Sequence, residues 1–294
     1  MFPNHREGAQ TMYRLVASDM DETFLDAEHK IPEVNVRAVR RMRELGVLLV
    51  PSSGRPYASI MESIRGLDPK LMEGGYVISF NGGFINRYGD PKPLLTCSLN
   101  RELAEELYAL GREHGYCMHV YAPDGLIYVC NLPESERRYL STLSGIVYFD
   151  PADEKDLSFL GDDVVKLLYM SDDFSGLREL GAQLKPEVAA KGGSVTYSSS
   201  RYLEFMPAGV NKGTGLLHLA KMLGIPREET IGVGDASNDA QMIELAGLGV
   251  GVANVTDDVR PLCDAVLDTR SDQGAFGELV ERFLEPGEGA GETA

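Results

Sequence analysis

The chain has 294 residues, 43% of them hydrophobic and 25% charged, which is the composition of an ordinary globular protein with room for two domains. Its formal net charge of −17 argues against nucleic acid or an anionic membrane surface as a partner. The four cysteines contain no C-x-x-C pair and the five histidines show no metal-ligand spacing, so we expect free thiols and no zinc site. With neither a signal peptide nor a long apolar run in the sequence, we expect a cytoplasmic protein.

Three strand–helix units are predicted in the first part of the chain, and each strand ends in polar residues or glycine. The predicted strands cover residues 15–17, 47–50 and 76–80, and the predicted helices cover residues 33–45 and 59–67. Asp19 and Asp21 follow the first strand, Ser53 and Arg55 follow the second, and Asn81 follows the third. Because parallel strands carry their carboxyl ends at one edge of a sheet, we expect these side chains along a single edge.

A segment of different character interrupts this pattern from about residue 86. It contains an amphipathic helix at residues 101–114 and two strands that flank Pro123-Asp124-Gly125, a strong hairpin signal because Asp-Gly supplies positive φ. Further elements are predicted at residues 164–170, 173–184, 195–197 and 202–206. Hairpins mixed with helices favour an α+β domain over residues 86–205, inserted between core segments 1–85 and 206–294.

The α/β rhythm returns after Pro207. Helices are predicted at residues 211–223, 240–246, 256–263 and 274–284, and strands at residues 230–233, 248–252 and 265–267. Lys212 opens the first of these helices, and Asp235 and Asp239 follow the first of these strands. We therefore predict an α/β fold, a Rossmann-like parallel-sheet core with an inserted α+β cap domain. The first twelve and last ten residues are polar and aperiodic, and are predicted to be loose tails.

The residues at the predicted strand ends combine four acids with a lysine and several hydroxyl and amide groups. Carboxylates packed closely together repel one another unless a cation or a proton lies between them. Mg²⁺ prefers oxygen ligands and keeps a substrate phosphate in its shell. An aspartate can attack phosphorus, and a second acid two residues away can protonate the leaving oxygen and then deprotonate the attacking water. The pattern therefore favours phosphoryl transfer assisted by Mg²⁺.

Two other interpretations of these residues stay open at this point. Clustered aspartates and a lysine at a sheet edge also suit a signalling protein that accepts a phosphoryl group, although the second acid at Asp21 and the long insertion argue against it. Some of the individual residues can also be interpreted as having only a structural role. Arg55 after a turn is often only salt-bridged, and Asn81 and Asn254 are typical turn and cap residues.

Four motifs in order resemble those of haloacid dehalogenase (HAD) superfamily phosphatases, of the Cof-type subfamily with a type-IIB cap. They are D-M-D-E-T (Asp19 to Thr23), S-S-G-R (Ser52 to Arg55), N-K-G (Asn211 to Gly213) and G-D-A-S-N-D (Gly234 to Asp239). One D-x-D-x-T is a weak signal, but four motifs with an insertion between the second and third are specific. The resemblance covers nearly the whole chain outside the two tails.

The resemblance implies a separate role for each catalytic residue. Asp19 is expected to be the nucleophile and a Mg²⁺ ligand, and Asp21 the general acid and base whose backbone carbonyl also ligates Mg²⁺. Lys212 is expected to neutralise the phosphate and orient Asp19. Asp235 is expected to ligate Mg²⁺, and Asp239 to do so directly or through water.

The resemblance also implies a substrate-binding set, which comprises Thr23, Ser53, Gly54, Arg55, Asn81, Asn238 and Asn254. Thr23 and Ser53 would bind phosphate, and Asn238 would lie at the phosphate or in support. Two positions depart from the family pattern. Glu22 replaces the usual glycine of the first motif, and this is expected to alter the conformation of the turn or the charge near it. Ser53 replaces threonine and keeps the hydroxyl.

The expected function is a Mg²⁺-dependent phosphatase that hydrolyses small phosphate monoesters, such as sugar phosphates or a phosphorylated cofactor, through an aspartyl-phosphate on Asp19. The cap would close over the site and select the leaving group. The alternatives are the phospho-acceptor protein and a phosphosugar mutase of the same superfamily. A small-molecule phosphate monoester is the expected partner, with no nucleic acid or membrane, and the chain is expected to be a monomer or homodimer.

Overall fold

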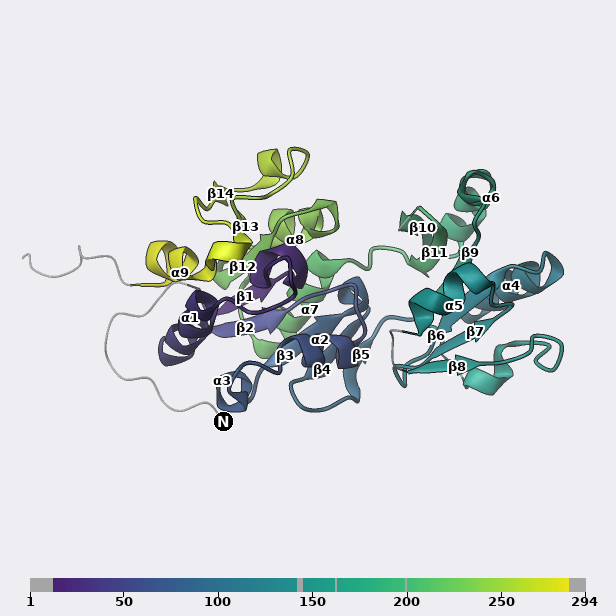
Figure 1. The fold of residues 1–294 in the computed structure, drawn as a ribbon, viewed down its shortest axis with the longest axis horizontal. Coiled ribbons are helices and arrows are strands. Elements are labelled where there is room, and N and C mark those ends of the chain that lie inside the picture. The colour runs from purple at the N-terminus through teal and green to yellow at the C-terminus, as the bar shows by residue number, and fades with distance from the viewer. Residues whose placement is uncertain (1–12, 142–144, 162, 199, 286–294) are drawn as a thin grey trace, which may run out of the picture. The chain divides into compact units, whose positions relative to one another are not determined.

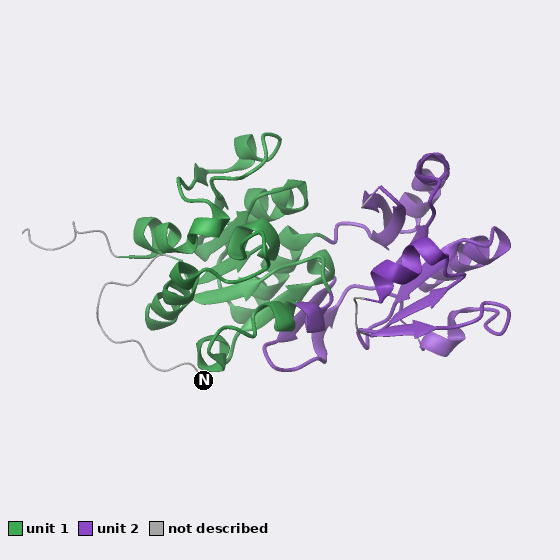
Figure 2. Ribbon diagram, in the orientation of Figure 1, with its two compact units in different colours: residues 1–55, 60–82, 211–294 green, residues 56–59, 83–210 purple. Residues whose placement is uncertain are grey.

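The computed structural model describes residues 13–141, 145–161, 163–198 and 200–285; the predicted tail at 1–12 and nearly all of the tail at 285–294 lie outside the described residues. The chain forms two compact units (Figure 2). The first unit comprises residues 1–55, 60–82 and 211–294, and the second comprises residues 56–59 and 83–210. No helix in the described part of the chain has both the length and the apolarity to span a bilayer.

A parallel sheet forms the centre of the first unit (Figure 1). Its strand order is β14 (Ala265–Val266), β13 (Leu248–Gly251), β12 (Thr230–Gly234), β1 (Leu15–Ser18) and β2 (Leu48–Pro51), and all neighbouring pairs are parallel. Strand β3 (Tyr76–Ser79) follows beside β2 through a parallel bridge between Ser52 and Ile78. The central strand β1 is fully buried, as expected for a parallel sheet covered on both faces. The predicted α/β core is confirmed.

The helices of the first unit follow from apolar residues at helical spacing. In α1 (Glu33–Glu44), Ala38, Val39 and Met42 are buried on one face, and the chain turns away at Gly46, whose φ is 75°. The remaining helices of the core segments are α3 (Pro69–Met72), α7 (Lys212–Leu223), α8 (Ala240–Leu245) and α9 (Phe276–Leu279). Helix α2 (Tyr57–Ser63) follows β2 in the chain.

A six-stranded, mainly antiparallel sheet forms the second unit. Its order is β10 (Gly193–Ser198), β11 (Tyr202–Pro207), β9 (Lys166–Met170), β6 (Cys117–Tyr121), β7 (Ile127–Cys130) and β8 (Ile146–Tyr148). The helices are α4 (Arg101–Glu113), α5 (Glu134–Leu140) and α6 (Phe174–Ala190), and β4 (Phe84–Arg87) pairs with β5 (Pro93–Thr96). The hairpin predicted around Gly125 is confirmed, because β6 and β7 pair antiparallel on either side of it.

Alternate side chains of the central strands build the core of the second unit. Met118 and Val120 of β6 and Tyr169 of β9 belong to one buried apolar cluster with Leu107 of α4 and Leu177 of α6. The side chains between them along the strands belong to the opposite face of the sheet. Helices α4 and α6 therefore cover one face, and the sequence alternation that predicted strands also explains the core.

Several of the predicted helices differ from the structure, and the one predicted at residues 59–67 is α2, which ends at Ser63. Residues 256–263 form no α-helix, because Thr256 to Val259 is a tight turn and Arg260–Leu262 is a single 3₁₀ turn around Pro261, which has no backbone N–H to donate. Conversely, α6 runs past its predicted end at Leu184 to Ala190, with Pro186 inside it. The prediction missed the short elements β4, β5, α3, α5 and β8, which span few residues each.

Candidate active site

Two aspartates stand at the carboxyl ends of neighbouring strands of the first unit. Asp19 directly follows β1, and its backbone N–H donates to the carbonyl oxygen of Val233 on β12 at 2.9 Å, which extends the parallel ladder by one bond. Asp235 directly follows β12. Both are buried, with exposed fractions of 6% and 7%. The parallel pairing of β1 and β12 thus brings the first and fourth sequence motifs together.

Lys212 links this pair to the third motif. It is the first residue of α7, whose N-cap Asn211 accepts a hydrogen bond from the backbone N–H of Thr214 at 2.9 Å. The Lys212 side chain is completely buried. Its Nζ lies 2.5 Å from Oδ1 of Asp19 and 2.7 Å from Oδ1 of Asp239. One ammonium group therefore bridges two carboxylates that lie more than 200 residues apart in the chain.

Asp239 is held in the turn that follows β12. Its Oδ2 accepts hydrogen bonds from the backbone N–H groups of Asp235 (3.1 Å) and Ala236 (3.3 Å). Gly234 permits this fold-back, because a Cβ at that position would come within 2.3 Å of the Asp239 Cβ. The turn is further tied by the N–H of Thr256, which donates to the carbonyl of Asp235 at 2.8 Å.

Asp19, Asp235 and Asp239 form a buried group with one carboxylate oxygen from each residue lying within 4.8 Å of the others. Thr23 donates from Oγ1 to Oδ1 of Asp235 at 2.6 Å. Three carboxylates share the single positive charge of Lys212. The group therefore carries excess negative charge, and its possible ligand atoms are all oxygens. Oxygen donors with uncompensated charge suit a hard divalent cation such as Mg²⁺.

The pKa values of the group reflect the same excess of negative charge. Burial raises the pKa of Asp19 to about 7, with the neighbouring Asp239 charge adding to the rise and Lys212 opposing it. Burial also raises the pKa of Asp235 to about 6, against the hydrogen bond from Thr23. Burial opposes the charge of Lys212, yet the two carboxylates outweigh it and raise the pKa of the lysine. Lys212 therefore stays protonated, and the acids lack counter-charge.

Asp21 does not join the carboxylate group. Its Oδ1 accepts a hydrogen bond from Nη2 of Arg55 at 2.6 Å, and Nδ1 of His29 lies 2.8 Å from the same oxygen. Arg55, predicted to bind substrate, thus contacts the predicted acid and base. No motif in the sequence marks His29, because it follows the first motif in a loop without periodicity.

The second motif and Asn81 meet at the ends of β2 and β3. The N–H of Ser53 donates to Ile78 at 3.0 Å, and the N–H of Asn81 donates to the Ser53 carbonyl at 3.0 Å. A Cβ on Gly54 would lie 3.1 Å from Oδ1 of Asn81, an atom that is buried without a hydrogen-bond partner. Ser53, Gly54 and Asn81 are thereby brought together, with a polar oxygen still to be satisfied.

The remaining predicted substrate-binding residues have different settings. Asn254 is held within the first unit by both of its polar side-chain atoms, since its Nδ2 donates to the carbonyl of Glu22 at 2.7 Å and its Oδ1 accepts from the N–H of Ser271 at 3.0 Å. Thr23 is buried against Asp235. Asn238 is exposed on the short turn before α8. Asn254 and Thr23 therefore hold the loops of the site in this structure.

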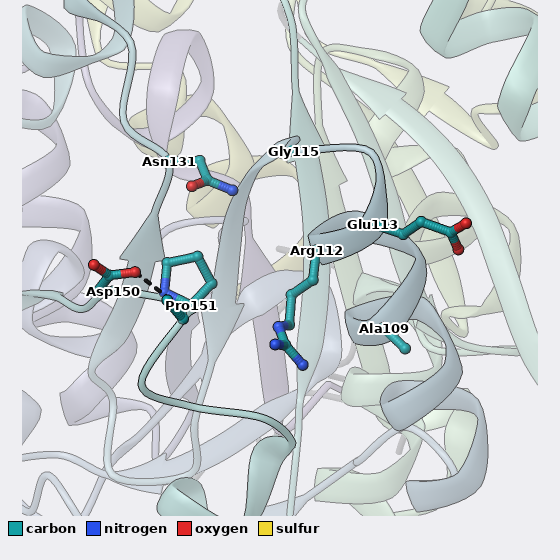
Figure 3. A pocket seen from close by; sticks show the side chains of 8 residues that line it. Ala109, Arg112, Glu113, Gly115, Asn131, Asp150 and Pro151 are labelled. Atoms are coloured by element: carbon teal, nitrogen blue, oxygen red, sulfur yellow. Dashed lines mark hydrogen bonds between the residues drawn. The ribbon is translucent and has the colours of Figure 1, made fainter.

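A separate cavity of about 570 Å³ lies in the second unit (Figure 3). Its lining residues come from the end of α4 and two loops, and are Ala109, Arg112, Glu113, Gly115, Asn131, Asp150, Pro151 and Ala152. The guanidinium of Arg112 is used by the chain itself, because Nη1 donates to the carbonyl of Lys155 at 2.6 Å. None of the predicted site residues lines this cavity, so the acids and lysine of the first unit remain the candidate active site.

Comparison with known proteins identifies the family. The family model of haloacid dehalogenase-like hydrolases matches residues 16–279. The chain belongs to this family. A haloacid dehalogenase-like hydrolase from Bacteroides thetaiotaomicron has the same fold, with a TM-score of 0.76 and 27% identity over 92% of this chain and 99% of that chain.

Named phosphatases are among the relatives of this HAD-like hydrolase. Phosphatase YwpJ of Bacillus subtilis (strain 168) is 28% identical over 286 residues, which cover 89% of this chain and 96% of that protein. HMP-PP phosphatase of Yersinia pseudotuberculosis serotype O:1b (strain IP 31758) is 29% identical over 243 residues, or 83% and 85% of the two chains. The HAD-like hydrolase is thus a phosphatase, and the resemblance noted in the sequence is confirmed.

Proposed function

We propose that this phosphatase hydrolyses small phosphate monoesters with Mg²⁺ and forms an aspartyl-phosphate on Asp19. The observation that carries the proposal is the buried contact of Lys212 with Asp19 and Asp239, next to Asp235. A carboxylate fixed in this way at the sheet edge is preorganised as a nucleophile, and its neighbours leave charge to be balanced by a cation and a phosphate.

In the first step, a carboxylate oxygen of Asp19 attacks phosphorus and the bond to the ester oxygen breaks. The electron pair of that bond goes to the leaving oxygen, which takes a proton from the carboxyl group of Asp21. Lys212 orients Asp19 through its 2.5 Å contact and attracts the phosphoryl oxygens. General acid help of this kind is typically worth about 10²–10⁴-fold.

In the second step, water attacks the phosphorus of the aspartyl-phosphate. Asp21, now ionised, takes a proton from that water, and the bond from phosphorus to the Asp19 oxygen breaks to release inorganic phosphate and restore both carboxyl groups. Asp19, Asp235 and Asp239, with the backbone carbonyl of Asp21, are the residues that would hold Mg²⁺. When bound, the ion supplies charge neutralisation for the phosphoryl group.

The substrate is expected to be small. The relatives named as phosphatases support a phosphate ester as the substrate, and a sugar phosphate or a phosphorylated cofactor is the kind that we propose. Ser53, Gly54, Arg55 and Asn238 would bind its phosphate, while the second unit, inserted in the chain between Gly82 and Asn211, would select the leaving group. A cytoplasmic location and a monomeric or homodimeric state are further parts of this proposal, in keeping with the free cysteines and acidic composition.

The test is phosphate release from a panel of phosphate monoesters, with Mg²⁺ and with excess EDTA, for wild type and Asp19→Asn. We expect the wild type to release phosphate with Mg²⁺ and not with EDTA, and the variant to release none in either condition. Asp272→Asn, at an exposed acid that pairs with Arg270, is the matched control and should keep full activity. Full turnover by Asp19→Asn would refute the proposed nucleophile, and a stable phosphoryl group on Asp19 without release would favour the phospho-acceptor alternative.

A further inference from the structure

The carboxylate of Asp21 is bound through one oxygen only. Arg55 donates to Oδ1 at 2.6 Å, Nδ1 of His29 lies 2.8 Å from the same oxygen, and no residue in the described part of the chain donates to Oδ2. The contact with His29 needs a hydrogen on Nδ1, since an ionised carboxylate only accepts. One oxygen of the predicted acid and base is therefore saturated, and the other is left available.

The Arg55 side of this arrangement is fixed by the sheet. The N–H of Arg55 donates to Oγ of Ser53 at 3.2 Å, and its carbonyl accepts from the N–H of Phe80 at 3.2 Å. Its Nη1 also donates to Oγ of Ser63 on α2 at 3.3 Å. The guanidinium therefore reaches Asp21 from an anchored backbone.

The His29 side is fixed by a tight turn of the chain. Oδ1 of Asp26 accepts from the N–H groups of Glu28 (3.0 Å) and Lys30 (2.8 Å), and the N–H of His29 donates to the Asp26 carbonyl at 3.0 Å. The turn holds His29 at a φ of 57°, in the left-handed region, where Asn, Asp and His are the most frequent residues other than Gly. The turn therefore sets the backbone of His29, and the ring contacts Asp21.

We infer that His29 is a positioning residue that, together with Arg55, assigns the reactive proton of Asp21 to Oδ2. With the hydrogen of the ring on Nδ1, two donors occupy the lone pairs of Oδ1, which leaves Oδ2 as the oxygen that carries the proton of this carboxyl group. In the first step the O–H bond at Oδ2 breaks as the leaving oxygen gains that proton, and in the second step the proton of the attacking water returns to Oδ2. The inference rests on the proposed function, in which Asp21 is the acid and base.

The loss of rate on removal of the His29 donor should therefore depend on the leaving group of the substrate. An alkoxide needs a proton as it departs, whereas p-nitrophenolate does not, so a misplaced acid slows alkyl phosphates selectively. The ratio kcat/KM is the suitable quantity, because it covers the steps up to formation of the aspartyl-phosphate and excludes its hydrolysis.

Two variants at position 29 distinguish the loss of the hydrogen-bond donor from a loss of folding. His29→Gly removes the donor and His29→Asn keeps one, and both residues accept the positive φ. His29 is 60% exposed and Asp21 37%, and exposed ion pairs contribute little to stability, so both variants should fold. We expect His29→Gly to lower kcat/KM about ten-fold for an alkyl phosphate and less than about two-fold for p-nitrophenyl phosphate, and His29→Asn to recover most of the loss.

A crystal structure of His29→Gly gives a readout that does not depend on turnover. We expect the Asp21 carboxylate to adopt a second orientation once one of its two donors is gone. An equal fall for both substrates, no fall for either, or an unchanged single orientation of Asp21 would overturn the inference. Failure of the proposed function is seen separately, as wild-type protein that releases no phosphate or as an active Asp19→Asn variant.

Discussion

Replacement of Lys212 by methionine tests how the site is held together. The ammonium group is completely buried and lies 2.5 Å from Asp19 and 2.7 Å from Asp239. Methionine fills a similar volume without charge, so the change removes the counter-charge of two buried carboxylates and leaves the packing of α7 largely in place. An uncompensated charge in the interior is the main cost of breaking such a contact.

The expected loss follows from that burial. Removing one partner of a buried ion pair costs about 3–5 kcal/mol in the free energy of unfolding. For a protein of this size each kcal/mol shifts Tm by roughly 2–4 °C, which gives a fall of about 6–20 °C. The loss should be larger at pH 8 than at pH 5, because burial raises the pKa of Asp19 to about 7 and the acid can take up a proton at the lower pH.

The assay is thermal unfolding in EDTA at pH 5 and pH 8, together with phosphate release in Mg²⁺. Lys221→Met is the matched control, since Lys221 is exposed in the last turn of the same helix. We expect the control to unfold like the wild type and keep its activity, and Lys212→Met to be inactive. A Lys212→Met protein as stable as the control at pH 8 would falsify the view that this lysine neutralises the buried acids.

Four further predictions concern the same unit. In EDTA, stability should fall as pH rises from about 4 through 7, because Asp235 and Asp19, with folded pKa values of about 6 and 7, hold protons that the unfolded chain has released; Mg²⁺ should flatten this slope in thermal unfolding. Gly82→Ala should cost about 2–4 kcal/mol in denaturant unfolding, since Gly82 has a φ of 94° and a Cβ would lie 2.1 Å from a backbone oxygen. Asn254→Ala loses two hydrogen bonds and should cost about 1–3 kcal/mol by the same measurement, with a lower kcat; an unchanged midpoint would argue against a role in holding the loop. Glu22→Gly should raise stability by about 1 kcal/mol.

The sequence located the centre of the site because parallel strands place their carboxyl ends together. Asp19 and Asp235 could each be assigned to the end of a strand from the apolar runs before them, and the contact of Lys212 with Asp19 was expected from the motif resemblance. These residues depend on the positions of the strands, which local apolar patterns indicate well. Which strands neighbour which, such as β1 between β12 and β2, came only from the structure.

The contacts of the surrounding loops could not be predicted in the same way. Thr23 and Arg55 are expected to bind the substrate, and that prediction did not include the contacts they make in the structure, Thr23 with Asp235 and Arg55 with Asp21. His29 was not selected at all. The partners of such side chains are set by turns that bring distant loops together, and turn conformation follows from side-chain hydrogen bonds that carry no periodic signal.

Glu22 shows how a departure from a family pattern becomes a physical question. The usual glycine of the first motif is replaced here, and Glu22 adopts φ 54° and ψ 15°, a left-handed conformation that costs a residue with a Cβ about 1–2 kcal/mol. Its carbonyl accepts the hydrogen bond from Asn254, so the turn is held from outside. Its charge adds to the effect of burial in raising the pKa of Asp235.

Glu22→Gly removes both the strain and the charge of this turn, whereas Glu22→Gln removes only the charge. If strain dominates, thermal unfolding in EDTA should show a gain of about 1 kcal/mol for the glycine variant and little change for the glutamine variant. If charge near Asp235 dominates, both variants should gain equally and lose part of the pH slope. A glycine variant less stable than the wild type would contradict the argument from backbone strain, because the left-handed turn would then depend on the glutamate side chain itself.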